Sequence, residues 1–357
     1  MSKKVYAVIM AGGRGERFWP LSTAERPKQF LTLFGGKTLL AQAVERLEGV
    51  IPTERILVIT SADLVELTRS EAPALLPDNV IGEPCGRDTA AACALACALV
   101  ERRDPDGVVC ILTADQIMRD VVAFRRTLSD AAVVAATHDV IVTLGIVPTS
   151  PATGFGYIRA VGEFTAPTAT PFLEVESFVE KPDLATAERY LAEGGYFWNA
   201  GMFIWRTSVM HRALAKFTPV LEAMYRRLVE APAGTAAELA IINEIYPGLE
   251  RISVDYAVME HSTNLVVARS DFGWDDVGTW GSAADHLPVC ESGNALVGKC
   301  FTLDATNNVV VAADGGEVAL LGVEGLVVVQ HKGKTLVCSK DRAQDIKKLL
   351  QVRERLL

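Results

Sequence analysis

The chain has 357 residues, a length that suits one large domain accompanied by a smaller one. Half of the residues are hydrophobic and 22% are charged, which allows a large buried core and excludes a disordered protein. The net charge of −9 argues against a protein that binds nucleic acid or an anionic membrane, because both classes need a basic surface. We therefore expect neither kind of partner.

The seven cysteines form no CxxC pair and no disulfide-like framework. Their odd number and apolar surroundings predict reduced thiols and a cytoplasmic protein. Cys93 and Cys97 share a predicted helix face without a nearby histidine, so packing is favoured over metal binding. The apolar run within residues 1–10 is too short for a signal peptide and predicts a first strand, and no stretch is expected to span a bilayer.

Strand and helix patterns alternate over the first 150 residues. This repetition predicts a doubly wound, mostly parallel sheet, in which ligands bind at the carboxyl ends of the strands. The segment from Ala11, Asp115 and the Glu180-Lys181 pair all fall at such ends. The predicted strands cover residues 5–10, 56–60, 108–113 and 140–146, and the predicted helices cover residues 39–47, 62–76, 89–103 and 124–137.

The later part of the chain changes in character. Residues 148–285 are less regular, with a turn-rich stretch at 165–171 and a helical pattern over 208–230. After Asp285, short valine-rich strands separated by glycines predict a few coils of β-solenoid or a small sheet, closed by an amphipathic helix over 341–357. We therefore predict two domains, residues 1–285 and 286–357. The short strands cover 309–311, 318–321, 326–329 and 335–337.

A glycine-rich segment follows the first strand. Gly12, Gly13 and Gly15 let the backbone turn sharply and bring its N–H groups against an anion. The segment matches neither the Walker A loop nor the dinucleotide loop GxGxxG, since its spacing differs and Pro20 interrupts a helix. Clustered cations favour phosphate binding over a purely structural turn. These cations are Arg14, Arg17, Arg26 and Lys28.

Two aspartates are candidate metal ligands. Asp115 ends a buried strand, where a charge is costly unless it is paired or bound to a metal. Asp276 lies in the aromatic, glycine-rich stretch GWDDVGTW. Two carboxylates holding Mg²⁺ against phosphates match the usual binding of that ion. Solvated or helix-capping aspartates are the alternative that the spacing alone leaves open.

Two further segments carry polar groups suited to a sugar phosphate. Glu180 and Lys181 follow a strand and would suit a hydroxyl and a phosphate, although such a pair is ordinarily a surface ion pair. Asn199 stands beside the strand over residues 202–205 and could bind sugar hydroxyls, but an asparagine in a turn fits the local sequence equally well.

Taken together and in order, these segments resemble the mannose-1-phosphate guanylyltransferases of the sugar nucleotidyltransferase superfamily. The resemblance runs from residue 7 to about residue 280. The matching motifs are AGGRGERFWPLS with RPKQF, GEPCGRDTAA, LTADQ, TGFGYI, FVEKPD, WNAGMF, ISVDYAVME and FGWDDVGTW.

The resemblance implies an α/β fold, in which a Rossmann-like, doubly wound mixed sheet is followed by a small C-terminal left-handed β-helix-like domain. It implies a Mg²⁺-dependent reaction in which GTP and mannose 1-phosphate give GDP-mannose and pyrophosphate, in a cytoplasmic homodimer. The chain ends without the isomerase-type domain of longer members, so a single activity is expected.

The resemblance also implies site residues. Arg17, Lys28 and Asp115 would be catalytic, and Asp115 and Asp276 would hold Mg²⁺. Two larger sets would bind the substrates. The nucleotide set is Ala11, Gly12, Gly13, Gly15, Glu83, Arg87 and Thr89, and the sugar-phosphate set is Gly156, Glu180, Lys181, Asn199 and Asp255.

This sequence departs from the family pattern at three positions. Gln116 stands where histidine is usual, Asp88 where asparagine is common, and Phe155 where tyrosine is frequent. None of the three removes a catalytic charge, but they leave base and sugar preference open. The alternatives are a guanylyltransferase for another hexose or a heptose 1-phosphate, a non-catalytic regulatory subunit that binds sugar nucleotides and, more distantly, a nicotinamide-dependent oxidoreductase.

Overall fold

A computed structural model describes residues 4–13, 15–232 and 235–356 of the chain. The chain forms two compact units, each assembled from separate segments. The first unit comprises residues 1–12, 43–114 and 118–274, and the second comprises residues 13–42, 115–117 and 275–357. Because the units are defined by contacts rather than by continuous sequence, the predicted division after residue 285 stays a prediction.

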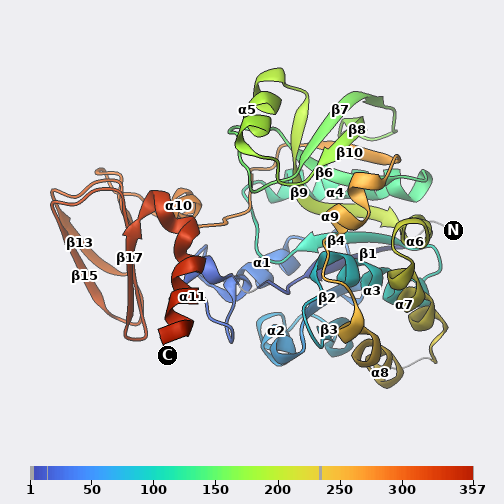
Figure 1. The fold of residues 1–357 in the computed structure, drawn as a ribbon, viewed down its shortest axis with the longest axis horizontal. Helices are drawn as coiled ribbons and strands as arrows, with labels where there is room; N and C mark the ends of the chain where they lie inside the picture. Colours follow the sequence, from blue (N-terminus) through green and yellow to red (C-terminus); the bar gives the residue numbers. More distant parts are fainter. Residues whose placement is uncertain (1–3, 14, 233–234, 357) are drawn as a thin grey trace. The chain divides into compact units, whose positions relative to one another are not determined.

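The first unit contains a nine-stranded sheet in the order β3-β2-β1-β4-β9-β6-β10-β8-β7 (Figure 1). Strands β1 to β4 pair in parallel, whereas β9 is antiparallel to both β4 and β6. The sheet is therefore mixed, as the resemblance implies, and less parallel than the strand–helix repetition alone predicts. The strands are β1 (Val5–Met10), β2 (Ile56–Ser61), β3 (Val80–Glu83), β4 (Val108–Thr113), β6 (Ile141–Ile146), β7 (Tyr157–Phe164), β8 (Phe172–Val179), β9 (Tyr196–Arg206) and β10 (Leu265–Ser270).

Helix α3 (Asp88–Arg103) occupies the core of this unit. Every residue from Ala90 to Val100 is buried, so the helix is apolar on all sides. It packs against α6 (Thr207–Phe217) and α7 (Pro219–Glu230). The other helices that lie wholly or partly in this unit are α1 (Leu39–Glu45), α2 (Val65–Glu71), α4 (Val121–Thr137), α5 (Leu184–Glu193), α8 (Thr235–Ile245) and α9 (Val254–Ala257). The predicted strands and helices of the first 150 residues are confirmed to within a few residues, except that the predicted helix over 62–76 is shorter.

Three local expectations need correction. The helical pattern over 208–230 is two helices, because Pro219 has no N–H to continue the first and instead begins the second. The closing helix begins as a 3-10 segment, Lys340–Asp345, before α11 (Ile346–Leu356). Asn199 lies inside β9 and not in a turn.

The second unit contains short parallel strands arranged in coils. One sheet has the order β12-β14-β16-β17, in which only β17 is antiparallel to its neighbour, and a second sheet pairs β13 with β15 in parallel. Two buried asparagines connect successive coils: the backbone N–H of Asn308 donates to Asn294 Oδ1, and the N–H of Leu326 donates to Asn308 Oδ1. This confirms the predicted coiled strands. The strands are β12 (Ala295–Val297), β13 (Lys299–Leu303), β14 (Val309–Ala312), β15 (Glu317–Leu321), β16 (Leu326–His331) and β17 (Lys334–Ser339).

The core of the second unit joins segments far apart in the sequence. Phe18 packs on Trp280 of α10 (Trp280–Ala283), with ring centroids 5.0 Å apart, and both side chains are fully buried. Valines of β14 and β16 belong to the same apolar cluster. The glycine-rich segment is thus anchored by its aromatic residues to the coiled strands. Two further short strands, β5 (Ile117–Met118) and β11 (Trp274–Asp275), lie where the chain passes from one unit to the other.

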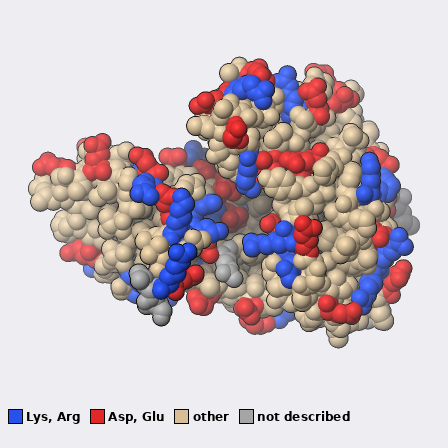
Figure 2. All heavy atoms as spheres, in the orientation of Figure 1, with Lys and Arg blue, Asp and Glu red and all other residues tan. Residues whose placement is uncertain are grey.

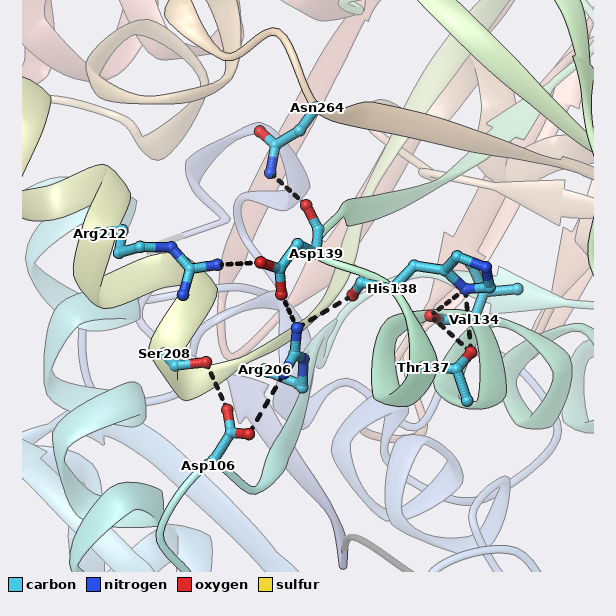
Figure 3. A network of polar contacts seen from close by, with 9 residues as sticks. All are labelled: Asp106, Val134, Thr137, His138, Asp139, Arg206, Ser208, Arg212 and Asn264. Atoms are coloured by element: carbon cyan, nitrogen blue, oxygen red, sulfur yellow. Dashed lines mark hydrogen bonds and ion pairs between the residues drawn. The ribbon is translucent and has the colours of Figure 1, made fainter.

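A polar network closes the amino ends of β4 and β6 in the first unit (Figure 3). Arg206, at the end of β9, forms ion pairs with Asp106 and Asp139, each of which lies two residues before the start of one of those strands. Arg212 of α6 contacts Asp139 as well, with 3.0 Å between Nη2 and Oδ2. Because ligands of such sheets bind at the opposite, carboxyl ends of the strands, we assign this network a structural role.

Charged side chains of both signs are interspersed on the face of the molecule shown in Figure 2. On this face the positive charge is not segregated from the negative charge. Within the described part of the chain we find no helix with the length and apolar character that crossing a bilayer requires. None of the seven cysteines, all of which lie in described segments, forms a disulfide.

Candidate active site

Lys28 is the centre of a group of predicted residues in the second unit. It begins a 3-10 turn, Lys28–Phe30, and its side chain is only 6% exposed. Its Nζ lies 3.0 Å from Asp115 Oδ2 and donates to the backbone carbonyl of Asp276 at 2.6 Å. The exposed Arg17 donates from Nη1 to the carbonyl of Gly278 at 3.4 Å. We call Arg17, Lys28, Asp115 and Asp276 the charge cluster.

The charge cluster combines two cations with two carboxylates. Burial raises the pKa of the Asp276 carboxyl; Lys28 opposes this, the Asp115 carboxylate adds to it, and a hydrogen bond from Gln116 lowers it again. The two cations Lys28 and Arg17 therefore balance the two carboxylates, and the cluster carries no surplus charge of either sign. Among the residues described, no group of three or more His, Cys, Asp or Glu side chains has the arrangement of a metal site. A pair of carboxylates nonetheless fits Mg²⁺, which takes few protein ligands and completes its shell with water and phosphate.

Gly15 allows Lys28 to approach the glycine-rich segment. Its φ of 60° lies in the left-handed region, and a Cβ placed on it would lie 2.3 Å from Lys28 Cβ. Ser22 holds the same turn by donating from Oγ to the Gly15 carbonyl at 2.6 Å. A Cβ on Gly13 would meet nothing within 4 Å, and Arg14 lies outside the described residues. The local geometry therefore requires a glycine at position 15 but not at position 13.

The nucleotide set in the first unit is organised around Glu83, at the carboxyl end of β3. Tyr246, fully buried in a 3-10 turn, donates its hydroxyl to Glu83 Oε1 at 2.8 Å. Burial raises the pKa of Glu83 to about 7, and the hydrogen bond from Tyr246 opposes this rise. The other carboxylate oxygen, Oε2, faces Gly12, where a Cβ would lie 3.5 Å from it. Glu83 is thus a buried acceptor beside the start of the glycine-rich segment.

Other members of the nucleotide set bind backbone. Arg87 donates to the carbonyls of Tyr246 and Pro247, and Thr89 Oγ1 accepts from the N–H of Val254 at 2.9 Å. Ala11 is buried, and its N–H donates to the Ile59 carbonyl on β2. These contacts hold the segment after β3 against residues 246–254. The structure therefore brings Glu83, Arg87 and Thr89 to one region, where the side chains of Arg87 and Thr89 form hydrogen bonds with backbone groups.

The sugar-phosphate set forms a second group in the first unit, which we call the amide cluster: Glu180, Lys181, Asn199 and Asp255. Lys181 Nζ lies 2.6 Å from Glu180 Oε1, so this pair is an ion pair as the alternative interpretation expects, but the Glu180 side chain is only 8% exposed. Asn199 Nδ2 donates to Asp255 Oδ1 at 3.0 Å. The predicted set is therefore assembled in one place.

Gly156 completes the amide cluster by its lack of a side chain. A Cβ there would lie 2.5 Å from Glu180 Oε2 and 3.4 Å from Asn199 Cβ. The Gly156 carbonyl accepts from the N–H of Asn199 at 2.8 Å. Burial, and secondly the nearby Glu180 carboxylate, raise the pKa of Asp255 to about 7. The cluster thus buries two carboxylates close together.

Three residues with contacts in these groups were absent from the predicted site sets. Tyr246 binds Glu83, Thr143 binds Asn199, and Gln116 binds Asp276. Thr143 stands in an apolar strand and Tyr246 in the turn sequence Tyr246-Pro247-Gly248, and no local signal distinguishes either residue. Gln116 could have been found, since it follows a predicted metal-binding aspartate.

Comparisons with known proteins identify the family of this chain. Residues 6–290 match the family model of nucleotidyl transferases, and residues 298–352 match the "MannoseP isomerase/GMP-like beta-helix domain". A mannose-1-phosphate guanylyltransferase of Klebsiella pneumoniae is 39% identical over 351 residues, which are 96% of this chain and 73% of that protein. One from Escherichia coli (strain K12) is 38% identical over 98% of this chain and 73% of the relative.

A solved structure is similar over the whole chain. The protein described as mannose-1-phosphate geranyltransferase from Thermus thermophilus superposes with a TM-score of 0.88 at 37% identity, covering 98% of this chain and 99% of that one. The fold and the family model define the class: this chain is a nucleotidyltransferase with a C-terminal β-helix-like domain. Within that class it belongs to the family of the mannose-1-phosphate guanylyltransferases.

Proposed function

We propose that this enzyme transfers GMP from GTP to mannose 1-phosphate, giving GDP-mannose and pyrophosphate. The observation that carries the proposal is Lys28: a buried ammonium in contact with Asp115 and Asp276 at the end of a glycine-rich segment. Such an arrangement suits a reaction whose chief demand is neutralising phosphate charge. The names of the relatives support mannose 1-phosphate and the guanylyl group as substrates.

The chemistry asks little of acid–base groups. A phosphate oxygen of the sugar phosphate attacks the α-phosphorus, the bond to the β-phosphate oxygen breaks, and pyrophosphate leaves. Since the nucleophile is already anionic, no strong general base is needed. Lys28 and Arg17 would then stabilise the charge that develops on the phosphates, each as a fixed cation.

We further propose that Asp115 and Asp276 hold Mg²⁺. Two carboxylates from distant segments in one cluster support this, because Mg²⁺ takes few protein ligands and completes its shell with water and phosphate oxygens. When bound, Mg²⁺ would supply additional charge neutralisation on the phosphates. Gln116, as a neutral donor to Asp276, would keep that carboxylate oriented.

Guanine preference is proposed to depend on Glu83. Guanine presents two adjacent N–H donors, at N1 and N2, which an ionised carboxylate can accept together. Glu83 has one oxygen bound to Tyr246 and the other directed to Gly12, so it offers acceptors and no donor when ionised. Uracil and thymine present one ring N–H beside two carbonyls, which a carboxylate would repel.

The test is pyrophosphate release across a panel of nucleoside triphosphates and sugar 1-phosphates with Mg²⁺ present. We expect the highest kcat/KM for GTP with mannose 1-phosphate. Preference for UTP or dTTP would overturn the guanine assignment, and preference for another hexose or a heptose would replace the sugar. Binding of GDP-mannose without Mg²⁺-dependent turnover would favour the regulatory-subunit alternative.

A homodimer and a cytoplasmic location complete the proposal. Two-fold dimers are the commonest assembly of soluble enzymes, and light scattering coupled to gel filtration tests this state. Seven free cysteines fit a reducing compartment, and fractionation of the source cells tests the location.

A further inference from the structure

The side chain of Asn199 is aimed by a bulge in β9. Thr143 on β6 pairs with Phe203, and Gly145 pairs with Asn199, so one residue of β6 opposes three residues of β9. Gly201, within this bulge, has φ of 70°. Bulges of this kind redirect a side chain and recur beside active sites. The bulge makes the orientation of the Asn199 amide a built feature of the sheet.

Both acceptor positions of the Asn199 oxygen are occupied by the protein. The backbone N–H of Gly201 donates to Oδ1 at 3.0 Å, and the hydroxyl of Thr143 donates to it at 3.0 Å. Because a backbone N–H can only donate, the atom that it contacts must be the oxygen, which fixes which way the amide points. Asn199 therefore has no acceptor capacity left for a ligand.

The amide nitrogen is only half used. Nδ2 has two hydrogens, of which one is donated to Asp255 Oδ1 at 3.0 Å. Among the residues that the structure describes, no acceptor is found for the second hydrogen. Glu180 supplies the opposite character in the same cluster, since its carboxylate can only accept while it is ionised. The cluster thus combines one neutral donor with one acceptor.

We infer that Thr143 is a positioning residue for the sugar phosphate. By occupying the Asn199 oxygen, Thr143 leaves the Asn199 amide able only to donate, and a hydroxyl or phosphate oxygen of the ligand can accept that hydrogen bond. The inference rests on the proposed function and specifies how its sugar-binding region works. Thr143 is fully buried on β6, and its single hydroxyl hydrogen is shared between Asn199 Oδ1 at 3.0 Å and the Met202 carbonyl at 3.3 Å, so the hydroxyl joins the bulge to the Asn199 amide. It acts through Asn199.

The experiment compares Thr143→Val with Thr143→Ser. Valine keeps the volume but loses the hydroxyl, which leaves Asn199 Oδ1 and the Met202 carbonyl without that donor. We expect Thr143→Val to raise the KM for mannose 1-phosphate about fivefold, with kcat and the KM for GTP within about twofold of wild type. Thr143→Ser keeps the donor and should recover most of this loss.

Thr207→Val is the matched control for a lost buried hydroxyl. Thr207 is also fully buried in the first unit, and its hydroxyl binds Glu101, remote from the predicted site residues. We expect this variant to lower stability and to leave both KM values unchanged. If it raised the KM for mannose 1-phosphate as much as Thr143→Val does, the Thr143 effect would be general destabilisation and the inference would fail.

Deoxy analogues of mannose 1-phosphate give a readout that a purely structural role would not move. In the wild type, removal of the hydroxyl that meets Asn199 should raise KM, and the same removal should cost Thr143→Val much less. An equal loss in both proteins for every analogue would contradict the inference.

A measurement without turnover separates this inference from the proposed function. With ¹⁵N-asparagine labelling, the Asn199 side-chain signals are identified by their absence in Asn199→Ala. We expect Thr143→Val, but not Thr207→Val, to shift them. If the wild type turns over no sugar phosphate, the proposed function fails, and the shift still tests the positioning role. Unshifted signals in Thr143→Val would overturn the inference whatever the activity.

Discussion

In the charge cluster a buried ammonium, Lys28 Nζ, contacts a carboxylate and a carbonyl oxygen, whereas in the amide cluster a neutral amide, Asn199, connects a hydroxyl, a backbone N–H and a carboxylate. Charge is a long-range property that tolerates small displacements, but a hydrogen bond depends on direction. We therefore expect the first cluster to govern turnover and the second to govern recognition. Variants of the two clusters should separate kcat from KM.

The largest effect is expected at the charge cluster. Lys28→Ala and Asp276→Ala should each lower kcat by about two orders of magnitude or more, because fixed charge near the reacting phosphates is lost. Steady-state kinetics measure this loss. Lys299→Ala is the control, because it removes an exposed lysine of β13 and leaves the charges of the charge cluster unchanged. If both variants stayed within about threefold of wild type, the charge cluster would not be catalytic.

The next effect concerns how Lys28 is held. Gly15→Ala places a Cβ in the left-handed region and against the Lys28 side chain, so we expect a loss of about 1–3 kcal/mol in the free energy of unfolding. Urea denaturation measures this loss. Gly13→Ala is the matched control in the same segment, since its Cβ would meet nothing within 4 Å. Equal losses in the two variants would mean that the approach of Lys28 to Gly15 is unimportant.

The two clusters also differ in how far the sequence foretells them. The charge cluster follows from motifs: the glycines predict a turn, and Asp115 stands directly after a strand whose continuous apolar run identifies it. The strands over residues 5–10, 56–60, 108–113 and 140–146 are predictable for the same reason, since strands buried on both faces are apolar throughout, whereas β3, with four residues and a glycine and a glutamate among them, was not predicted. Family resemblance was still needed to choose catalytic roles over solvated aspartates.

The amide cluster could not be derived from local patterns. The local sequence of Asn199 fits a turn equally well, because no sequence pattern predicts that β9 continues through Gly201 as a bulge. Thr143 is one of many threonines in apolar runs, and its role depends on the pairing of β6 with a strand more than fifty residues later. Tyr246 reaches Glu83 across a still longer separation. Contacts of this range are set by tertiary structure.

A third prediction extends the comparison to Glu83, a buried carboxylate that, like Asp255, has a raised pKa. Since the pKa of Glu83 is about 7, the carboxyl gains a proton as pH falls through 7 and can no longer accept two N–H groups. We expect the KM for GTP to rise about tenfold for each pH unit below that point. Steady-state kinetics between pH 5.5 and 8 measure this rise, because that range extends by about one unit or more to each side of the pKa of Glu83.

Two variants separate Glu83 from ionisation of the triphosphate itself. Glu83→Gln should remove the pH-dependent step, because an amide does not titrate in this range. Tyr246→Phe should move the step to higher pH, because it removes the hydrogen bond that favours the ionised carboxylate. A step that persisted unchanged in both variants would belong to another group.

The smallest expected effect concerns the orientation of the Glu180 carboxylate in the amide cluster. Gly156→Ala would place a Cβ 2.5 Å from Glu180 Oε2, so the carboxylate must turn away, while Gly154→Ala, two residues earlier, meets nothing within 4 Å. We expect Gly156→Ala to raise the KM for mannose 1-phosphate about fivefold with little change in kcat, and Gly154→Ala to leave both unchanged. A fall in kcat at constant KM would instead place Glu180 with the groups that act on the transition state, and the division of labour between the two clusters would be wrong.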